Sequence, residues 1–125
     1  MNCHDAVWCS MCSHIALCKS FNRKSIYVSG PISGKLANNF RAFFRASRYV
    51  VAFLEGCPVN PLEIYQGKNT TWLEFMRTDI KALVDCEEIV MLPGWLWSRG
   101  ARIEFMIALF LGIRVRFLSE KICGK

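Results

Sequence analysis

Two carboxylates stand in apolar helical segments of this sequence, and together they could cleave a glycosidic bond. Glu104 is followed by an apolar run, from Phe105 to Phe110, that predicts a buried helix. Burying a carboxylate costs free energy unless the group is paired or has a function. Asp79 precedes Ile80, at the border of the inward face of another predicted helix. Two carboxylates from separate elements permit glycosidic cleavage, with one as nucleophile and the other as acid.

Each carboxylate also has a structural interpretation. Glu104 could form a salt bridge with Arg99 or Arg102 in its own segment. Asp79 could be an exposed helical carboxylate, because basic residues lie two positions to either side of it. Both interpretations stay open on the residues alone.

Two loops carry residues suited to phosphate and sugar oxygens. The first, at residues 29–34 (SGPISG), follows a short β-rich run, and its backbone N–H groups and the Ser33 hydroxyl can donate to such oxygens. It is neither a Walker loop nor a GxGxxG, which disfavours nucleoside triphosphates and dinucleotides. The second loop carries Trp95 and Trp97, which belong to the core, to a lid or to a base-stacking surface. The loop residues predicted to bind substrate are Ser29, Gly30, Ser33, Gly34, Trp95, Ser98 and Gly100.

The elements that must position these residues alternate between strand and helix patterns. The predicted strands are 25–29, 57–60, 88–92 and 113–118, and the predicted helices are 38–55, 72–84 and 99–111. Thr71 and Glu74 form a capping box before the second helix, which turns Leu73, Met76, Ile80 and Leu83 inward. Gly112 is the expected end of the third. Residues 62–70 read as a loop and 119–125 as a tail.

This alternation with short links predicts an α/β fold. We expect an open, doubly wound parallel sheet of Rossmann or flavodoxin type, with four to five strands and helices on both faces. In such a sheet ligands bind beyond the carboxyl ends of the strands, where both loops lie.

Composition limits the classes of protein and partner. The chain has 125 residues, of which 53% are hydrophobic and 21% charged, as expected for a folded domain. It has no apolar run of the roughly 18–20 residues that span a bilayer, and no convincing secretory signal, so a cytoplasmic location is predicted. A net charge of +6 suits an anionic partner. Arg41, Arg45 and Arg48 share a helix face, but no nucleic-acid recognition motif accompanies them, which favours a nucleotide over nucleic acid.

The first 23 residues read as an extension separate from the domain at 24–125. Four of the seven cysteines lie before residue 19, and Cys9-x-x-Cys12-x-His14 resembles half of a zinc site. No regular second half follows. We therefore expect a poorly ordered extension and no metal.

Three motifs together resemble the nucleoside 2-deoxyribosyltransferase superfamily. They are Tyr27-x-x-Gly30, Asp79 on the middle helix, and Ser98-x-Gly100-x-x-x-Glu104. The resemblance is greater to the branch of 2′-deoxynucleoside 5′-monophosphate N-glycosidases and covers residues 24 to about 118. It implies Glu104 as the nucleophile, Asp79 as the residue that contacts the sugar or helps to protonate the leaving base, and Tyr27 as the residue that orients the nucleophile.

The resemblance also implies how the substrate is held. Ser98 and the amides around Gly100 would hold a 5′-phosphate, with Ser33 and Gly34 on the other side, and no metal or organic cofactor would be needed. The transferases typically carry an aspartate a few residues before the nucleophile, whereas this chain has residues 95–99 (WLWSR) there. This departure favours hydrolysis of a nucleoside monophosphate. A transferase and a non-catalytic nucleotide-binding or sequestering protein remain the alternatives.

The segment from Phe105 to Leu111 is apolar nearly all round. Either it is buried on two sides or it forms a contact between subunits, which is common in the superfamily that the chain resembles. We expect a homodimer or a higher homo-oligomer.

Overall fold

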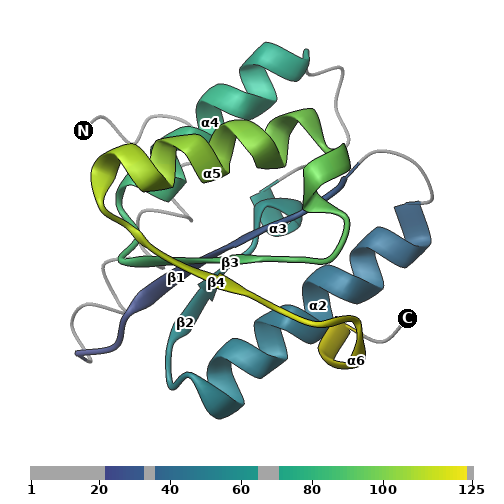
Figure 1. Ribbon diagram of the computed structural model, residues 1–125, viewed down its shortest axis with the longest axis vertical. Helices are drawn as coiled ribbons and strands as arrows, with labels where there is room; N and C mark the ends of the chain where they lie inside the picture. The colour runs from purple at the N-terminus through teal and green to yellow at the C-terminus, as the bar shows by residue number, and fades with distance from the viewer. Residues whose placement is uncertain (1–21, 33–35, 65–70, 124–125) are drawn as a thin grey trace.

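A parallel sheet forms the centre of the fold, and its strands follow the order β2-β1-β3-β4 (Figure 1). The computed structural model describes residues 22–32, 36–64 and 71–123, without the side chains of 36–39 and 63–64. Within this part of the chain the strands are β1 (Ser25–Ser29), β2 (Cys57–Val59), β3 (Glu88–Met91) and β4 (Arg114–Phe117). All the pairings are parallel, so the predicted open α/β sheet is confirmed with four strands.

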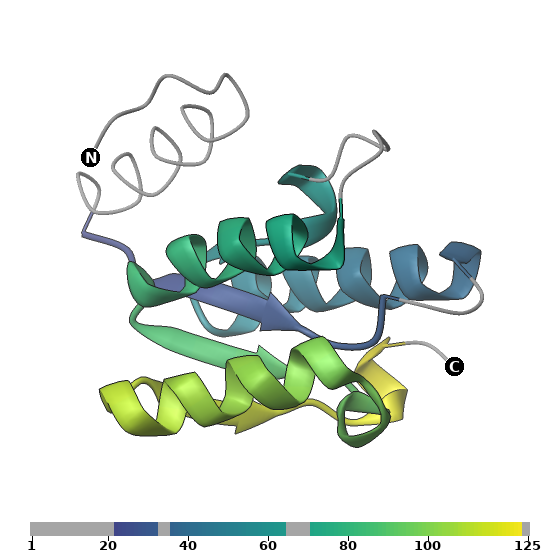
Figure 2. The same ribbon diagram turned by 90° about the horizontal axis from the view of Figure 1, so that it is seen from above.

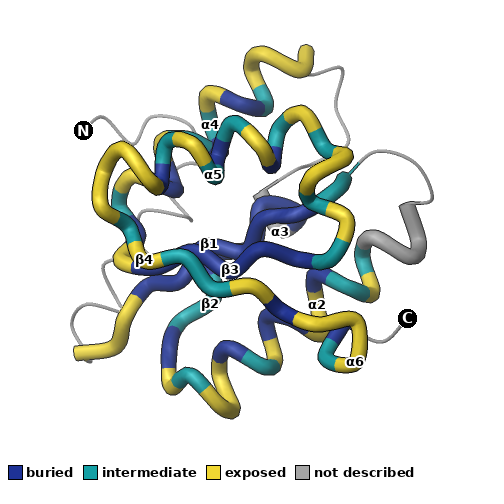
Figure 3. The backbone as a smooth tube through the Cα atoms, viewed as in Figure 1, coloured by how far each residue is buried: buried dark blue, intermediate teal, exposed yellow. Residues whose placement is uncertain are grey.

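Helices cover both faces of the sheet (Figures 1 and 2). On one face lie α4 (Trp72–Val84) and α5 (Arg99–Leu111), and on the other lie α2 (Leu36–Phe53) and α6 (Glu120–Cys123). The short α3 (Pro61–Ile64) follows β2, and the 3₁₀ turn η1 (Trp95–Trp97) precedes α5. Because both faces are covered, every residue of β1 and β3 is buried (Figure 3).

The two faces of β1 enter different hydrophobic clusters. Tyr27 packs with residues of α4 and α5, whereas Ile26 and Val28 pack with residues of α2. Successive side chains of a strand point to opposite faces, so the strand period assigns each residue to its layer. Asp79 of α4 and Glu104 of α5 are buried on the same side of the sheet as Tyr27.

Local signals define the helix ends. The Thr71 hydroxyl accepts a hydrogen bond from the Glu74 amide at 3.1 Å, and the Ser98 side chain accepts one from the Ala101 amide at 3.3 Å. Gly112 ends α5 with φ 71°, a left-handed conformation that glycine adopts without steric cost. The predicted starts of α4 and α5 and the end of α5 are thereby confirmed.

Several predicted boundaries are wrong. Helix α2 ends at Phe53 instead of residue 55, because Glu55 adopts φ 52° and the Gly56 amide bonds back to the Val50 carbonyl. The predicted loop at 62–70 contains most of α3, and the predicted tail contains α6, whose Cys123 packs under α2. Leu73 is 61% exposed instead of inward, because the first turn of α4 lies outside the core.

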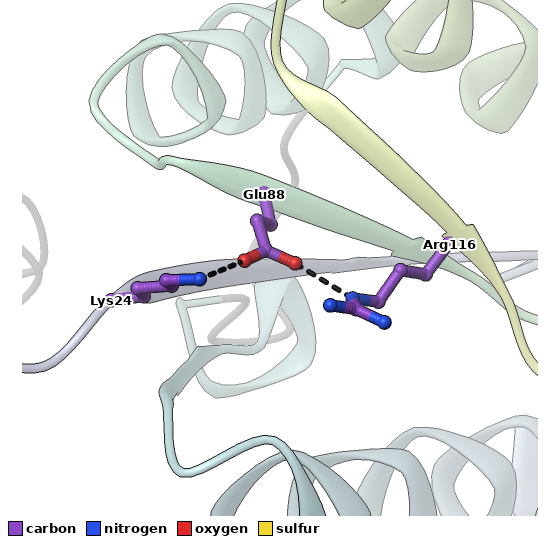
Figure 4. Close-up of polar contacts among 3 residues, drawn as sticks. All are labelled: Lys24, Glu88 and Arg116. Atoms are coloured by element: carbon purple, nitrogen blue, oxygen red, sulfur yellow. Dashed lines mark hydrogen bonds and ion pairs between the residues drawn. The ribbon is translucent and has the colours of Figure 1, made fainter.

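Glu88, at the start of β3, is a buried carboxylate with a structural role (Figure 4). One of its oxygens lies 3.1 Å from Lys24 Nζ and the other 2.8 Å from Arg116 Nε. Burial would raise its pKa, but the hydrogen bonds from Arg116 and Lys24 outweigh burial and lower the pKa below its ordinary value. The carboxylate therefore stays charged and ties the chain before β1 to β3 and β4.

Among the described residues, no helix is both long enough and apolar enough to cross a membrane.

Candidate active site

Glu104 is the centre of the candidate site, and its side chain is buried with 4% exposure. The Tyr27 hydroxyl donates a hydrogen bond to Glu104 Oε2 at 2.6 Å, and the Ser29 hydroxyl donates one to Oε1 at 2.6 Å. Each carboxylate oxygen thus has a short bond to a hydroxyl group. Two such donors fix the plane and direction of the carboxylate.

Strand and helix periodicity bring these three side chains together. Tyr27 and Ser29 are two positions apart on β1, so both point to the face that α4 and α5 cover. Glu104 lies on the buried stripe of α5 between Ala101 and Ala108. Because these two neighbours are small, α5 approaches the sheet closely enough for the Glu104 side chain to reach β1.

Asp79 supplies a second buried carboxylate on the same face. Its exposed fraction is 1%, and its Oδ1 atom has no hydrogen-bond partner. It lies on the buried face of α4 with Met76 and Leu83. The alternative that Asp79 is an exposed helical carboxylate is therefore wrong.

The alternative salt bridge for Glu104 is also wrong. Within the described residues, Glu104 has hydroxyl partners and pairs with neither Arg99 nor Arg102. Arg99 instead lies over the Trp72 ring, with its guanidinium carbon 4.0 Å from the ring centroid. This contact joins the first residues of α4 and α5.

Burial without a cation raises the pKa values of both carboxyl groups. For Asp79, desolvation comes first and the negative charge of Glu104 second, and they raise the pKa from 3.8 to about 9, although the Tyr27 hydroxyl opposes them. For Glu104, desolvation raises the pKa from 4.5 to about 7, while the hydrogen bonds from Ser29 and Tyr27 oppose the rise. Burial and the two neighbouring carboxyl groups also raise the pKa of Tyr27, which stays a neutral donor.

The two carboxyl groups are thereby suited to different roles at neutral pH. Asp79 keeps its proton and can donate it, whereas Glu104 is the group whose ionised form the two hydroxyls stabilise. A carboxylate held in one orientation can attack a carbon atom, and a protonated acid can give its proton to a basic leaving group on that carbon. Glu88 differs from this pair because two cations neutralise it.

The predicted phosphate-binding residues have clear structural positions. Ser98 caps α5, and a Cβ at Gly100 would lie 3.1 Å from Met76 Sδ, so Gly100 allows α4 and α5 to approach. A Cβ at Gly30 would lie 2.8 Å from Leu92 Cβ, so Gly30 allows β1 and β3 to approach at their carboxyl ends. Their contacts with phosphate stay predictions, and Ser33 and Gly34 lie outside the described residues.

Trp95 lies half-buried against other aromatic rings. Its ring centroid is 4.7 Å from that of Phe105 and 5.8 Å from that of Phe117. Trp97, in contrast, is 91% exposed. A base-stacking role of Trp95 stays a prediction, and any such stacking would use a ring already packed against α5 and β4.

The role of Ser29 toward Glu104 was missed at the level of sequence. The loop motif assigns Ser29 to substrate, whereas its hydroxyl bonds to the candidate nucleophile. The available signal was its spacing from Tyr27, because two residues apart on a strand share a face. Among the described residues, no cluster of three or more His, Cys, Asp and Glu side chains could hold a metal ion. The cysteine-rich segment, with Cys9, Cys12 and His14, lies outside them.

Comparison with known proteins gives one family. A domain of unknown function, DUF4406, matches residues 24–117 and so spans β1 through β4 and every residue of the candidate site. No curated protein matches the chain. No solved structure matches it either.

Proposed function

The chain belongs to the DUF4406 family of domains of unknown function, and from its buried carboxylate pair we propose that it hydrolyses the base–sugar bond of (deoxy)nucleoside 5′-monophosphates. The observation that carries this proposal is the placement of Glu104 between the hydroxyls of Tyr27 and Ser29, with a second buried carboxyl group, Asp79, near enough for the charge of Glu104 to raise its pKa. The motif resemblance to the deoxyribosyltransferase superfamily supports the same reaction class.

In the first step Glu104 acts as the nucleophile. A carboxylate oxygen attacks the anomeric carbon and forms a glycosyl ester, while the bond from that carbon to the base nitrogen breaks and its electron pair leaves with the base. The hydroxyls of Tyr27 and Ser29 favour the ionised carboxylate and hold it in one orientation. Within the described residues, no lysine or arginine forms a salt bridge with Glu104, so its carboxylate is not neutralised.

Asp79 acts as the acid in this step and as the base in the next. Its raised pKa keeps a proton on the group at neutral pH, and that proton goes to the departing base. Water then attacks the glycosyl ester, Asp79 takes a proton from the water, and Glu104 leaves as a carboxylate. The products are the free base and the sugar 5-phosphate.

The start of α5 is the proposed place for the 5′-phosphate. The positive end of the helix dipole favours an anion there, and Arg99 adds a positive charge at the first helical residue. Ser98 and Gly100 belong to the same turn, on the helix that also carries Glu104. The helix therefore sets the distance between the phosphate and the nucleophile.

Release of free base from a panel of purine and pyrimidine nucleoside monophosphates tests the proposal. Glu104→Gln keeps the size of the side chain and removes its nucleophilicity, so we expect base release to fall by roughly 10³-fold or more. Glu74→Gln, an exposed carboxylate on α4, is the matched control and should retain wild-type activity. No release from any nucleotide, or equal release by wild type and Glu104→Gln, would refute the proposal.

A further inference from the structure

Asn60 is a buried polar side chain with an unused hydrogen-bond donor. It directly follows β2, its exposed fraction is 0%, and its Nδ2 atom has no hydrogen-bond partner. Leaving such a donor buried and unpaired costs about 1–3 kcal/mol. Native proteins contain few groups of this kind, and each one calls for an explanation.

A backbone contact fixes the orientation of the Asn60 amide. Its Oδ1 atom accepts a hydrogen bond from the Leu62 amide at 3.0 Å. The reversed amide would place two donors against each other, so the oxygen must face Leu62. The amide can therefore offer a partner its NH₂ group, which donates and cannot accept.

The sheet order places the end of β2, which Asn60 directly follows, on the side of β1 opposite to the start of α5. β1 carries the hydroxyls that hold Glu104 and lies between β3 and β2. The chain after β3 leads into α5, and the chain after β2 begins with Asn60 and α3 (Figure 1). All three points lie at the carboxyl edge of the sheet.

This order fixes a direction for the substrate. With its phosphate at the start of α5 and its anomeric carbon at Glu104, a nucleotide directs its base across β1 toward the end of β2. We propose that Asn60 is a specificity-determining residue, which donates a hydrogen bond from Nδ2 to an acceptor atom of the nucleobase. This inference rests on the proposed function and adds a residue that distinguishes one nucleobase from another.

A donor without an acceptor discriminates between bases in a defined direction. A keto oxygen on the contacted edge of the base accepts from the NH₂ group, whereas an exocyclic amino group at the same position opposes it with its own hydrogens. Sites built to bond a polar group reject analogues that cannot form the bond, because the buried partner is then left unpaired. We therefore expect preference for the keto member of a keto–amino pair.

Two matched pairs of nucleotides test this preference. Deoxyuridine and deoxycytidine 5′-monophosphates carry a keto oxygen and an amino group, respectively, at the same position of a pyrimidine. Deoxyinosine and deoxyadenosine 5′-monophosphates carry the same two groups at one position of a purine. In one of these pairs the group that differs contacts Asn60. For that pair we expect wild type to favour the keto nucleotide at least about tenfold, both in kcat/KM for base release and in affinity by calorimetry.

Two variants withdraw the NH₂ group. Asn60→Ala removes it, and Asn60→Ser replaces it with a shorter side chain, whose hydroxyl can accept from the Leu62 amide but does not extend as far as Nδ2. Both should abolish the keto preference. Ser47→Ala, which removes a buried hydroxyl on α2 that bonds to the Phe43 carbonyl, is the control and should retain it.

The outcomes separate this inference from the proposed function. The role of Asn60 would be refuted if wild type released base without a keto preference, or if the preference survived in a folded Asn60 variant. Either result would leave the hydrolase proposal intact. Failure of wild type to bind or cleave any of the four nucleotides would refute the proposed function and this inference with it.

Discussion

At the scale of single residues, two buried glutamates show how the surroundings decide the chemistry of a carboxylate. Glu88 is paired with Lys24 and Arg116, and its pKa is lowered. Glu104 is bonded to the neutral hydroxyls of Tyr27 and Ser29, and its pKa is raised. A neutralised carboxylate stabilises the fold, whereas one without a cation costs stability and remains available for reaction.

Removal of the Tyr27 hydroxyl should change the pH dependence of the reaction. The hydrogen bond from Tyr27 lowers the pKa of Glu104, so in Tyr27→Phe the carboxylate forms only at higher pH. Because a hydrogen bond to a charged group contributes about 1.5–3 kcal/mol, the acidic limb of kcat/KM against pH should move up by about one to two units. Tyr49→Phe, on α2 at the other face of the sheet, should leave the profile unchanged. An unshifted limb in Tyr27→Phe would contradict the assigned role.

Asp79 should make the protein less stable at alkaline pH. Its pKa rises from 3.8 to about 9 on folding, so between these values the folded state binds more protons than the unfolded state. Stability must then fall as the pH increases from about 4 to 9, by on the order of a few kcal/mol. Denaturant unfolding at several pH values should show that Asp79→Asn is more stable than wild type at pH 8. The free energy of unfolding of this variant should also change less with pH than that of wild type. Glu87→Gln, an exposed control, should follow wild type, and identical curves for Asp79→Asn and wild type would contradict the burial argument.

At the scale of elements, the carboxyl edge of the sheet depends on close contact between two strand ends. A Cβ at Gly30 would lie 2.8 Å from Leu92 Cβ, which belongs to the stem of its side chain and cannot rotate away. Gly30→Ala should therefore cost about 1–3 kcal/mol in urea unfolding and should also reduce base release, because Ser29 is the adjacent residue. Gly112→Ala is the control: its φ of 71° makes alanine unfavourable by about 1 kcal/mol, at the end of α5 far along the helix from Glu104. Full activity in Gly30→Ala would show that strand spacing does not position the site.

The sequence predicted those elements whose signals are local. Thr71, Ser98 and Gly112 defined the ends of α4 and α5, and alternating strand and helix patterns gave the parallel sheet. The exposure of Leu73 and the packing of Trp95 on Phe117 depend on where distant elements meet, and no local pattern encodes this. The loop motif predicts that Ser29 is a site residue, but the hydrogen bond from Ser29 to Glu104 spans 75 positions and is visible only in the tertiary structure.

At the scale of the whole molecule, the outer face of α5 is apolar and exposed. The exposed fractions are 50% for Met106, 54% for Leu109 and 83% for Phe110. Burial on two sides is therefore excluded within the described residues, and we propose that this face forms the contact of a homodimer. Stable contacts between proteins bury about 1,200–2,000 Å² in total.

Light scattering with matched variants tests the dimer. Wild type should have the mass of two chains at micromolar concentration, and Phe110→Glu that of one. Phe53→Glu, with a side chain 72% exposed on α2, should remain a dimer. A monomeric wild type would refute the proposal.

The most direct test of the central claim is a search for the glycosyl ester on Glu104. Cleavage by trypsin after Arg102 and Arg114 releases residues 103–114, in which Glu104 is the one side-chain carboxylate. Enzyme mixed with excess nucleoside monophosphate, quenched in acid during the first turnover and digested should give this peptide with the added mass of a sugar phosphate. The same peptide from Glu104→Gln should carry no added mass and its sample no free base. Release of base by Glu104→Gln at the wild-type rate, or a sugar adduct on a different peptide, would contradict the account.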